Sequence, residues 1–313
     1  MKKKALLTGG AGFIGSNLTR KLVDEGWSVT VVDDLSTGKI SNINDLATKK
    51  AIKLYAGVDF ASPIILQAIQ SQAFDIIFHE AALPRVAYSV DNPFITTDVN
   101  IAKTVKLLEA CRGNIKRFVF ASSSSVYGGA DELPTPTTYS KNPKSPYALQ
   151  KSVCEDFLSM FSSLYKLETV SLRYFNVFGP NQYGDSAYST AISSWCNAIK
   201  NNLPLRSDGT GEQSRDMCYV ANVVNANILA AESNCTFSGD KFNVACGDRV
   251  SNNEILAYFM KRWPNATIIH APARVGDVMH SQADISETQD VLGYEPSTRF
   301  WDGLEHTTAW WEI

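Results

Sequence analysis

The chain has 313 residues, of which 44% are hydrophobic and 19% are charged, and its formal net charge is -3 at pH 7. These values are typical of a globular enzyme, and the lack of a long basic block argues against a nucleic-acid partner. No apolar run approaches the roughly 18 residues that a membrane span needs, so no membrane partner is expected. The six cysteines form no CxxC pair and have no histidines at matching spacing, so we expect reduced thiols, no metal site and a cytoplasmic address.

The first half of the chain alternates between strand and helix patterns. Gly26 and Gly113 are expected to end two helices, and Ser145 and Pro146 to cap and begin a third. This alternation predicts an α/β fold with a Rossmann-type, doubly wound parallel sheet. The predicted strands span residues 5–8, 28–33, 74–79, 116–121 and 169–174, and the predicted helices span 14–22, 99–112 and 146–164.

The composition changes after Pro180, where Ser, Asn, Gly and Tyr become frequent. Helices are predicted over residues 191–200 and 219–232, and a strand over 242–245. We expect two parts. Residues 1–178 form the sheet domain, to which 217–248 return, and residues 179–216 and 249–313 form a smaller C-terminal α/β lobe that covers it.

A glycine-spaced turn joins the first predicted strand to the first predicted helix. Gly9, Gly12 and Gly15 let the backbone approach a pyrophosphate, whose charge is favoured by the helix N-terminus. The second strand ends at Asp33, which is placed to accept hydrogen bonds from ribose hydroxyls and would repel the 2′-phosphate of NADP. The sequence therefore predicts NAD as the cofactor.

A tyrosine and a lysine at i and i+4 on one helix predict acid–base chemistry. Tyr147 and Lys151 share a helix face. The ammonium, together with a cationic nicotinamide, is expected to lower the phenol pKa from about 10, as a general base requires. A serine cluster (Ser122 to Ser125) follows a buried strand at its carboxyl end, where such sheets bind ligands.

Six motifs occur in order along nearly the whole chain: TGGAGFIGS, ASSSSVYG, SPYALQK, LRYFNVFGP, GEQSRD and GDVMHSQAD. In these motifs the chain closely resembles the extended short-chain dehydrogenase/reductase family, specifically its nucleotide-sugar epimerases. The resemblance implies that Ser123, Tyr147 and Lys151 are catalytic. It also implies that Arg215 and Arg274 bind the diphosphate of the substrate, because a planar guanidinium can donate two hydrogen bonds to such a group. The substrate-binding residues implied are Ser123, Ser124, Tyr147, Asn176, Arg215, Arg274, Asp277 and Ser281.

The resemblance also implies a set of cofactor contacts. In the family a Gly-Asp pair contacts adenine, but here Gly57, Val58 and Asp59 depart from that pattern, which leaves the role of Asp59 open. The cofactor-binding residues implied are Gly9, Gly12, Phe13, Ile14, Gly15, Asp33, Asp34, Leu35, Ser36, Thr37, Gly38, Asp59, Ala81, Ala82, Asn100, Ser122, Tyr147, Lys151 and Tyr174.

The serine cluster separates the chemistries of the family. Related 4,6-dehydratases carry Thr-Asp-Glu where this chain has Ser123, Ser124 and Ser125, so the acid pair that removes water is missing; Asp131 and Glu132 lie in a later loop and do not replace it. The mechanism implied is redox-neutral epimerisation at carbon 4 through a 4-keto sugar.

One position bears on the sugar. Enzymes of the family confined to UDP-glucose and UDP-galactose can have tyrosine where this chain has Ser281, and a small residue there leaves space for a 2-acetamido group. We therefore expect UDP-GlcNAc and UDP-GalNAc as substrates, with the non-acetylated pair as a further possibility. An epimerase of UDP-glucose alone or of UDP-glucuronate, and a non-catalytic NAD sensor, are the alternatives. The resemblance also implies a homodimer through the helices at 99–112 and 146–164.

Overall fold

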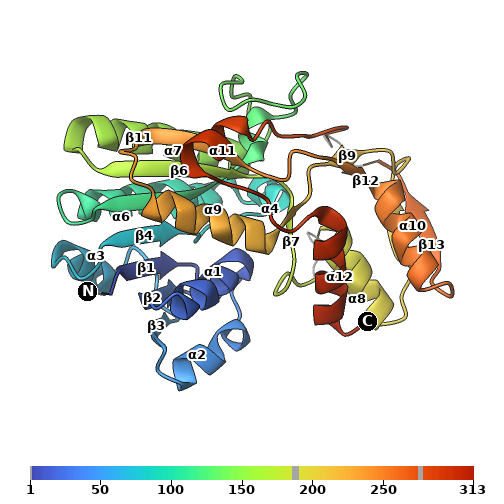
Figure 1. Ribbon diagram of the computed structural model, residues 1–313, viewed down its shortest axis with the longest axis horizontal. Helices are drawn as coiled ribbons and strands as arrows, with labels where there is room; N and C mark the ends of the chain where they lie inside the picture. Colours follow the sequence, from blue (N-terminus) through green and yellow to red (C-terminus); the bar gives the residue numbers. More distant parts are fainter. Residues whose placement is uncertain (1, 185–189, 274–277) are drawn as a thin grey trace.

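The computed structural model describes residues 2–184, 190–273 and 278–313 (Figure 1). Its centre is a seven-stranded parallel sheet of order β11-β6-β5-β4-β1-β2-β3, which confirms the predicted doubly wound fold. The strand order reverses between β1 and β4, and ligands bind at such a switch point outside the carboxyl ends of the strands. The strands are β1 (Lys4–Thr8), β2 (Ser28–Asp33), β3 (Ile52–Ala56), β4 (Ile76–His79), β5 (Arg117–Ser123), β6 (Glu168–Tyr174) and β11 (Ser238–Val244).

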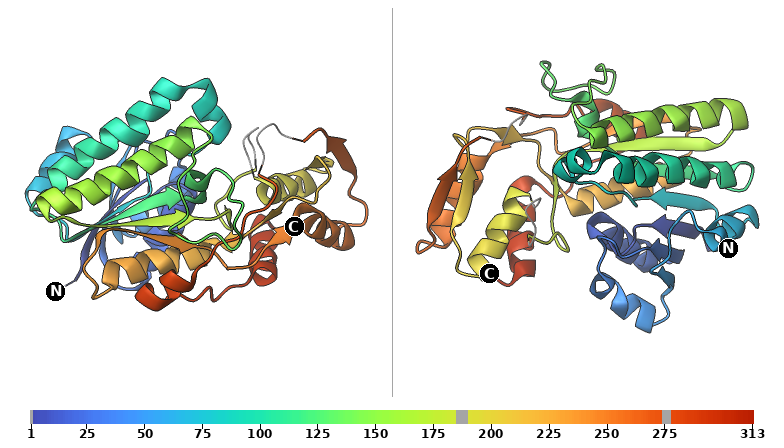
Figure 2. Two further views of the ribbon diagram at one scale, coloured as in Figure 1. Left: turned by 90° about the horizontal axis from the view of Figure 1, so that it is seen from above. Right: turned by 180° about the vertical axis from the view of Figure 1, so that it is seen from behind.

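Helices cover both faces of the sheet (Figure 2). One face packs against α3, α6 and α7, and the other against α1, α9 and α11. Two apolar clusters fill these interfaces, and both are built from alternating side chains of the same strands. The helices of this part are α1 (Phe13–Asp24), α2 (Asn44–Thr48), α3 (Pro63–Gln70), α4 (Val86–Asp91), α5 (Pro93–Thr97), α6 (Lys103–Cys111), α7 (Pro146–Tyr165), α9 (Val220–Glu232) and α11 (Ser286–Leu292), with the 3₁₀ turns η1 (Ile40–Asn42) and η3 (Ser124–Tyr127).

The predicted helix ends agree with local chemistry. The Ser145 side chain accepts a hydrogen bond from the Ala148 N–H, and Pro146 occupies the first turn of α7. Gly26 and Gly113 have φ of +81° and +71°, so each takes the left-handed conformation just after a helix that glycine adopts without steric cost.

The helix predicted over residues 99–112 is only partly correct. Pro93 begins α5, a π-helical turn η2 (Asp98–Ala102) follows, and α6 starts at Lys103. Apolar spacing does not reveal a π turn, because the widened turn is held by side chains from elsewhere in the fold, described below. The strand predicted over residues 242–245 is likewise longer, beginning at Ser238.

The second lobe lies at the carboxyl edge of the sheet (Figure 1). Its strands pair segments distant in sequence: β8 with β13, β9 with β12, and β7 with β10. The predicted division of the chain into two domains stays a prediction. The elements are β7 (Val177–Phe178), α8 (Ala191–Lys200), β8 (Leu205–Asp208), β9 (Ser214–Arg215), β10 (Cys218–Tyr219), β12 (Val250–Ser251), α10 (Asn252–Arg262), β13 (Ile268–Ala271) and α12 (Phe300–Trp311).

A single apolar cluster joins the two parts. Trp195 and Phe259 of the second lobe belong to the same cluster as Leu7 and Val119 of the central sheet. The boundary between the parts is therefore packed like an interior. Across the residues that the structure describes, no helix has the length and apolarity to cross a membrane.

Candidate active site

The glycine turn after β1 forms a backbone cradle. Gly9 has φ of +70°, and its N–H donates to the Val32 carbonyl at 2.9 Å. A Cβ on Gly15 would lie 2.1 Å from the Gly9 carbonyl oxygen, so only glycine allows α1 to start this close to the strand. Gly12 caps α1 without a side-chain bond, which leaves the first amides, including those of Phe13 and Ile14, at a helix N-terminus that suits a pyrophosphate. This geometry fits a dinucleotide.

The end of β2 collects the residues predicted to hold the adenosine ribose. The buried Asp33 carboxylate accepts the Ala11 N–H at 2.8 Å and the Leu35 N–H at 2.9 Å, and burial raises its pKa. A Cβ on Gly38 would lie 2.7 Å from an Asp33 oxygen, so the loop through Ser36 and Thr37 must close tightly over this carboxylate. Asp34 accepts the Ser36 N–H at 2.9 Å. That these residues bind the ribose stays a prediction.

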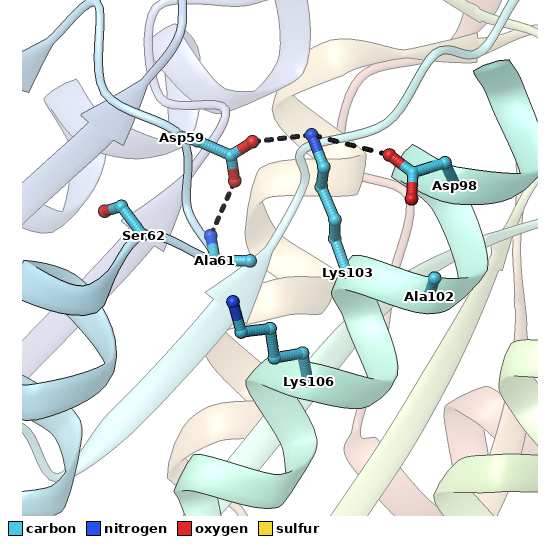
Figure 3. A pocket seen from close by; sticks show the side chains of 7 residues that line it. All are labelled: Asp59, Ala61, Ser62, Asp98, Ala102, Lys103 and Lys106. Carbon is cyan, nitrogen blue, oxygen red and sulfur yellow. Dashed lines mark hydrogen bonds and ion pairs between the residues drawn. The ribbon is translucent and has the colours of Figure 1, made fainter.

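Asp59 lies at a surface hollow of about 350 Å³ (Figure 3). One carboxylate oxygen accepts the Ala61 N–H at 2.7 Å, and the other is 2.6 Å from the Lys103 Nζ. Asp98 stands 3.8 Å from the same ammonium. Both oxygens of Asp59 already have a partner, so an adenine contact would have to share them.

Asn100, a predicted cofactor contact, sits in the middle of the π turn. Its side chain exchanges two hydrogen bonds with the backbone of Leu83, at 2.8 and 3.1 Å, and donates to the Gln150 Oε1 at 2.8 Å. It therefore holds the segment that contains Ala81 and Ala82 beside the glycine turn, where a Cβ on Gly9 would lie 2.7 Å from the Ala81 nitrogen. Gln150 lies within the SPYALQK motif, but no role was predicted for it from the sequence.

Tyr147 lies in the first turn of α7, and its hydroxyl is hydrogen-bonded to the Ser123 side chain at the end of β5. Its own N–H donates to the Ser89 Oγ at 3.1 Å, which fixes the start of the helix. The Lys151 ammonium, one turn along, donates to the Ala121 carbonyl at 2.6 Å. These contacts bring the three predicted catalytic residues to one strand end.

The pKa of Tyr147 differs from the expectation. Burial raises it to about 12; the hydrogen bond from Ser123 lowers it and the charge of Glu80 raises it. The Lys151 ammonium lies 5.9 Å from the centroid of the Tyr147 ring, and burial lowers its own pKa. Among the groups of the chain, the effect of burial therefore outweighs the hydrogen bond from Ser123, and the positive charge of a bound nicotinamide would lower the pKa of this phenol.

The side chain of Ser122, a predicted cofactor contact, is buried in the protein, and the contact stays a prediction. Its hydroxyl donates to the Glu155 Oε1 at 2.6 Å, and Glu155 accepts two hydrogen bonds of 2.8 Å from the buried Arg173 guanidinium. This group of contacts was not predicted from the sequence, because Ser122, Arg173 and Glu155 lie on three different elements, β5, β6 and α7. It fixes β5 one residue before Ser123 and α7 one turn after Lys151.

The predicted sugar-binding residues meet at the joint of the two lobes. The Asn176 Nδ2 donates to the Asp216 carbonyl at 3.2 Å and to the Ser281 Oγ at 3.3 Å. The Arg215 Nη1 donates to the carbonyls of Ser214 and Met279, at 3.0 and 3.1 Å. Ser124 lies in η3 beside Ser123. The predicted contacts Arg274 and Asp277 lie outside the described residues.

Asp216 holds together the segments that meet at the predicted sugar-binding residues. Its buried carboxylate accepts the N–H groups of Cys246, Gly247 and Ala283 at 2.9 to 3.1 Å. Its N–H donates to the Ser281 carbonyl at 2.8 Å. The backbone on both sides of Ser281 is thereby fixed.

Comparisons with known proteins agree with this geometry. Residues 5–245 match the model of the NAD dependent epimerase/dehydratase family. The chain belongs to this family. NAD is therefore its cofactor, as the cradle at Gly9 to Gly15 and the carboxylate at Asp33 suggest.

Members of the family with known names or structures cover almost the whole chain. A putative UDP-glucose 4-epimerase of Methanocaldococcus jannaschii is 32% identical over 97% of each chain. The solved UDP-N-acetylglucosamine 4-epimerase of Methanobrevibacter ruminantium M1, in complex with UDP-N-acetylmuramic acid, is 36% identical, with a TM-score of 0.93 over 100% of this chain and 99% of that one. The UDP-glucose 4-epimerase of Thermotoga maritima, solved with UDP-glucose, is 32% identical, with a TM-score of 0.91 over 99% and 98% of the two chains.

A segment of the second lobe also contacts residues that flank the glycine turn. The Tyr183 hydroxyl donates to the Asn42 Oδ1 at 2.8 Å, and the Lys39 Nζ lies 3.6 Å from the centroid of the Tyr183 ring. The Asn17 side chain donates to the Pro180 carbonyl at 3.0 Å. These contacts tie the second lobe to α1 and to the segment after β2, and they were not predicted from the sequence.

Proposed function

We propose that this NAD-dependent UDP-sugar 4-epimerase interconverts UDP-GlcNAc and UDP-GalNAc. The observation that carries the proposal is the small Ser281 side chain, 3.3 Å from the Asn176 amide. The backbone around Ser281 is fixed by hydrogen bonds to Ser214 and Asp216, so the space beside it is not closed by a shift of the chain. A 2-acetamido group needs such space next to the pyranose ring.

The residues of the chain suit the proposed reaction. Tyr147 takes the proton from the sugar 4-hydroxyl, and Ser123, hydrogen-bonded to it, orients that hydroxyl. NAD, when bound, supplies the acceptor and donor of the hydride. Arg215 and, by the resemblance, Arg274 hold the diphosphate while the flat 4-keto sugar turns over. The product and substrate then differ at one carbon only.

The substitution Ser281→Tyr tests the choice of sugar. The larger side chain should lower kcat/KM for UDP-GlcNAc by about 100-fold, because it fills the space for the acetamido group, and should leave UDP-glucose turnover within a few-fold. The measurement compares both enzymes on UDP-GlcNAc, UDP-GalNAc, UDP-glucose, UDP-galactose and UDP-glucuronate. A wild-type enzyme that prefers UDP-glucose or UDP-glucuronate to UDP-GlcNAc would disprove the proposal.

We also propose that the chain forms a two-fold dimer through α4, α5 and α7. The apolar side chains exposed on these neighbouring helices include Val90, Phe94, Leu149, Met160 and Leu164, at 42 to 83% of their surface. Apolar groups so concentrated on a surface mark an interface. The exposed large apolar residues of the described chain do not include any on α6, so this surface differs from the predicted one, which used residues 99–112.

The substitution Phe94→Glu should convert the dimer to a monomer, because it places a charge in the apolar contact. Sedimentation velocity measures the change. The matched control is Ile64→Glu on α3. Ile64 is also an exposed apolar residue (52%) but lies outside the proposed interface, so this substitution should leave the dimer intact. A wild-type chain that sediments as a monomer at micromolar concentration contradicts the proposal.

A further inference from the structure

Glu80 is a carboxylate at the centre of the site that the proposed mechanism does not use. It follows β4 directly, and its N–H donates to the Thr8 carbonyl at 3.2 Å, beside the glycine turn. It is partly buried, and no ion pair within 4.0 Å is found for it in the part of the chain that the structure describes. By contrast, the neighbouring carboxylate Glu155 is fully paired with Arg173.

A chain of hydrogen bonds holds Glu80 in place. The Asn227 Nδ2 on α9 donates to the Tyr174 hydroxyl at 2.7 Å, so the proton of that hydroxyl is directed to the Glu80 Oε1, also at 2.7 Å. Asn227 is itself fixed by a second hydrogen bond, from the same nitrogen to the Val223 carbonyl at 2.9 Å. Burial and the charge of Glu80 raise the pKa of Tyr174 well above its usual value, so Tyr174 stays a donor. Burial raises the pKa of Glu80 to about 7, whereas the hydrogen bond from Tyr174 and the charge of Lys151 lower it, so the carboxylate is ionised above about pH 7.

The place of Glu80 relative to the reaction follows from the strand order. Tyr147 and Ser123 lie at the end of β5, and β4 is the neighbouring strand. Tyr147 takes a proton from a sugar hydroxyl, and the carbon that carries this hydroxyl exchanges a hydride with the nicotinamide. The nicotinamide ring must therefore lie at this same edge of the sheet. The pyrophosphate cradle at β1 is adjacent to β4 on the other side. The cofactor therefore has to cross the end of β4, where Glu80 stands.

Two positive charges lie at this edge of the sheet when NAD is bound: the Lys151 ammonium and the oxidised nicotinamide. Lys151 is the charged group of the chain that interacts with Glu80, and its ammonium is engaged by the Ala121 carbonyl. The oxidised nicotinamide ring carries one positive charge and the reduced ring carries none. A fixed negative charge beside it stabilises the oxidised form relative to the reduced form, and the poorly hydrated interior screens this effect little.

We propose that Glu80, held by Tyr174 and Asn227, is a positioning residue whose negative charge keeps the bound nicotinamide in its oxidised form between turnovers. The proposal rests on the proposed epimerase function. In the first half-reaction the sugar carbon would give up a hydride, hence two electrons, to the ring, and its hydroxyl proton would go to Tyr147; the second half-reaction would return both to the sugar. If the 4-keto sugar leaves before that return, the enzyme keeps a reduced cofactor and is inactive. Glu80 opposes this loss by making the reduced state less stable.

The test uses the holoenzyme and a spectroscopic reading of the cofactor. The substitution Glu80→Gln keeps the shape and the acceptor for Tyr174 but removes the charge. After addition of the UDP-sugar that the wild type turns over, the ratio of reduced to oxidised bound cofactor, read from near-ultraviolet absorbance, should rise by about tenfold. The substitution Glu80→Asp keeps the charge and should restore most of the wild-type ratio. The substitution Tyr174→Phe releases the carboxylate from its fixed position and should raise the ratio by a smaller factor.

Asp75 provides the matched control. It lies exposed just before β4, at the opposite end of the same strand, where its carboxylate accepts the Lys4 N–H at 2.8 Å. The substitution Asp75→Asn removes the same charge and should leave the ratio unchanged. An unchanged ratio in a folded Glu80→Gln enzyme overturns the proposal, even if its kcat falls, because a merely structural role would alter activity alone. A wild type that turns over no UDP-sugar would instead refute the proposed function.

Discussion

The substitution Tyr147→Phe should lower kcat by about 1,000-fold on every sugar that the wild type accepts, because it removes the group that takes and returns the proton. Little else should change. The backbone N–H of Tyr147 still donates to Ser89, and the ring keeps its buried position. The hydroxyl is hydrogen-bonded to Ser123, which is partly accessible and can turn to water. Initial rates of epimerisation, with NAD content and melting temperature as controls, measure the effect.

The pH dependence supplies a second reading of the same group. Tyr147 acts as a base only when deprotonated, and burial raises its pKa, so the wild-type rate should increase with pH until the phenol is ionised in the enzyme with NAD bound. The phenylalanine variant should show no such increase. A variant with wild-type kcat, or with the same pH profile at a lower rate, would assign the base to another residue.

The substitution Gly15→Ala should yield a protein that has lost most of its NAD. The new Cβ would lie 2.1 Å from the Gly9 carbonyl oxygen and 2.9 Å from the Gly10 Cα, and both are backbone atoms that cannot move without opening the turn. We expect a cost of about 3 kcal/mol, or about 100-fold in cofactor affinity. The cofactor released by denaturation, measured per mole of protein, gives the result.

Gly26 offers the control for this experiment. A Cβ there meets no atom within 4 Å, and the only penalty is its φ of +81°. Gly26→Ala should therefore lose about 1 kcal/mol of stability and keep its NAD. Equal NAD loss in both variants would mean that the close approach at Gly15 is not what the cofactor site depends on.

The sequence predicted those helices and strands whose bounds depend only on residues close together in the chain. Ser145 and Pro146 specify the start of α7 through a cap and a fixed φ, and residues 191–200 form a helix with the predicted bounds. The π turn around Asn100 was missed because the Asn100 side chain is held by Leu83 and Gln150, which are 17 and 50 residues away in the sequence. The paired short strands of the second lobe were missed for the same reason.

The candidate site shows the same division. Motif spacing identified Ser123, Tyr147 and Lys151, which the fold brings together. The ion pair that supports them, between Glu155 and Arg173, was not predicted, because it depends on α7 and β6 meeting in space. Glu80 was also overlooked, since a carboxylate after a buried strand looks like an ordinary strand end until Tyr174 is seen to point at it.

The single apolar cluster that includes Trp195, Phe259 and Leu7 has a consequence for how the molecule loses its structure. Two units that share one interior cannot melt independently, because exposing the face of either one uncovers the other. Heating should thus give one sharp transition rather than two. The lobe that carries Ser281, to which we attribute sugar choice, is accordingly not a detachable module, and grafting it onto a relative would need the sheet beneath it to be exchanged as well.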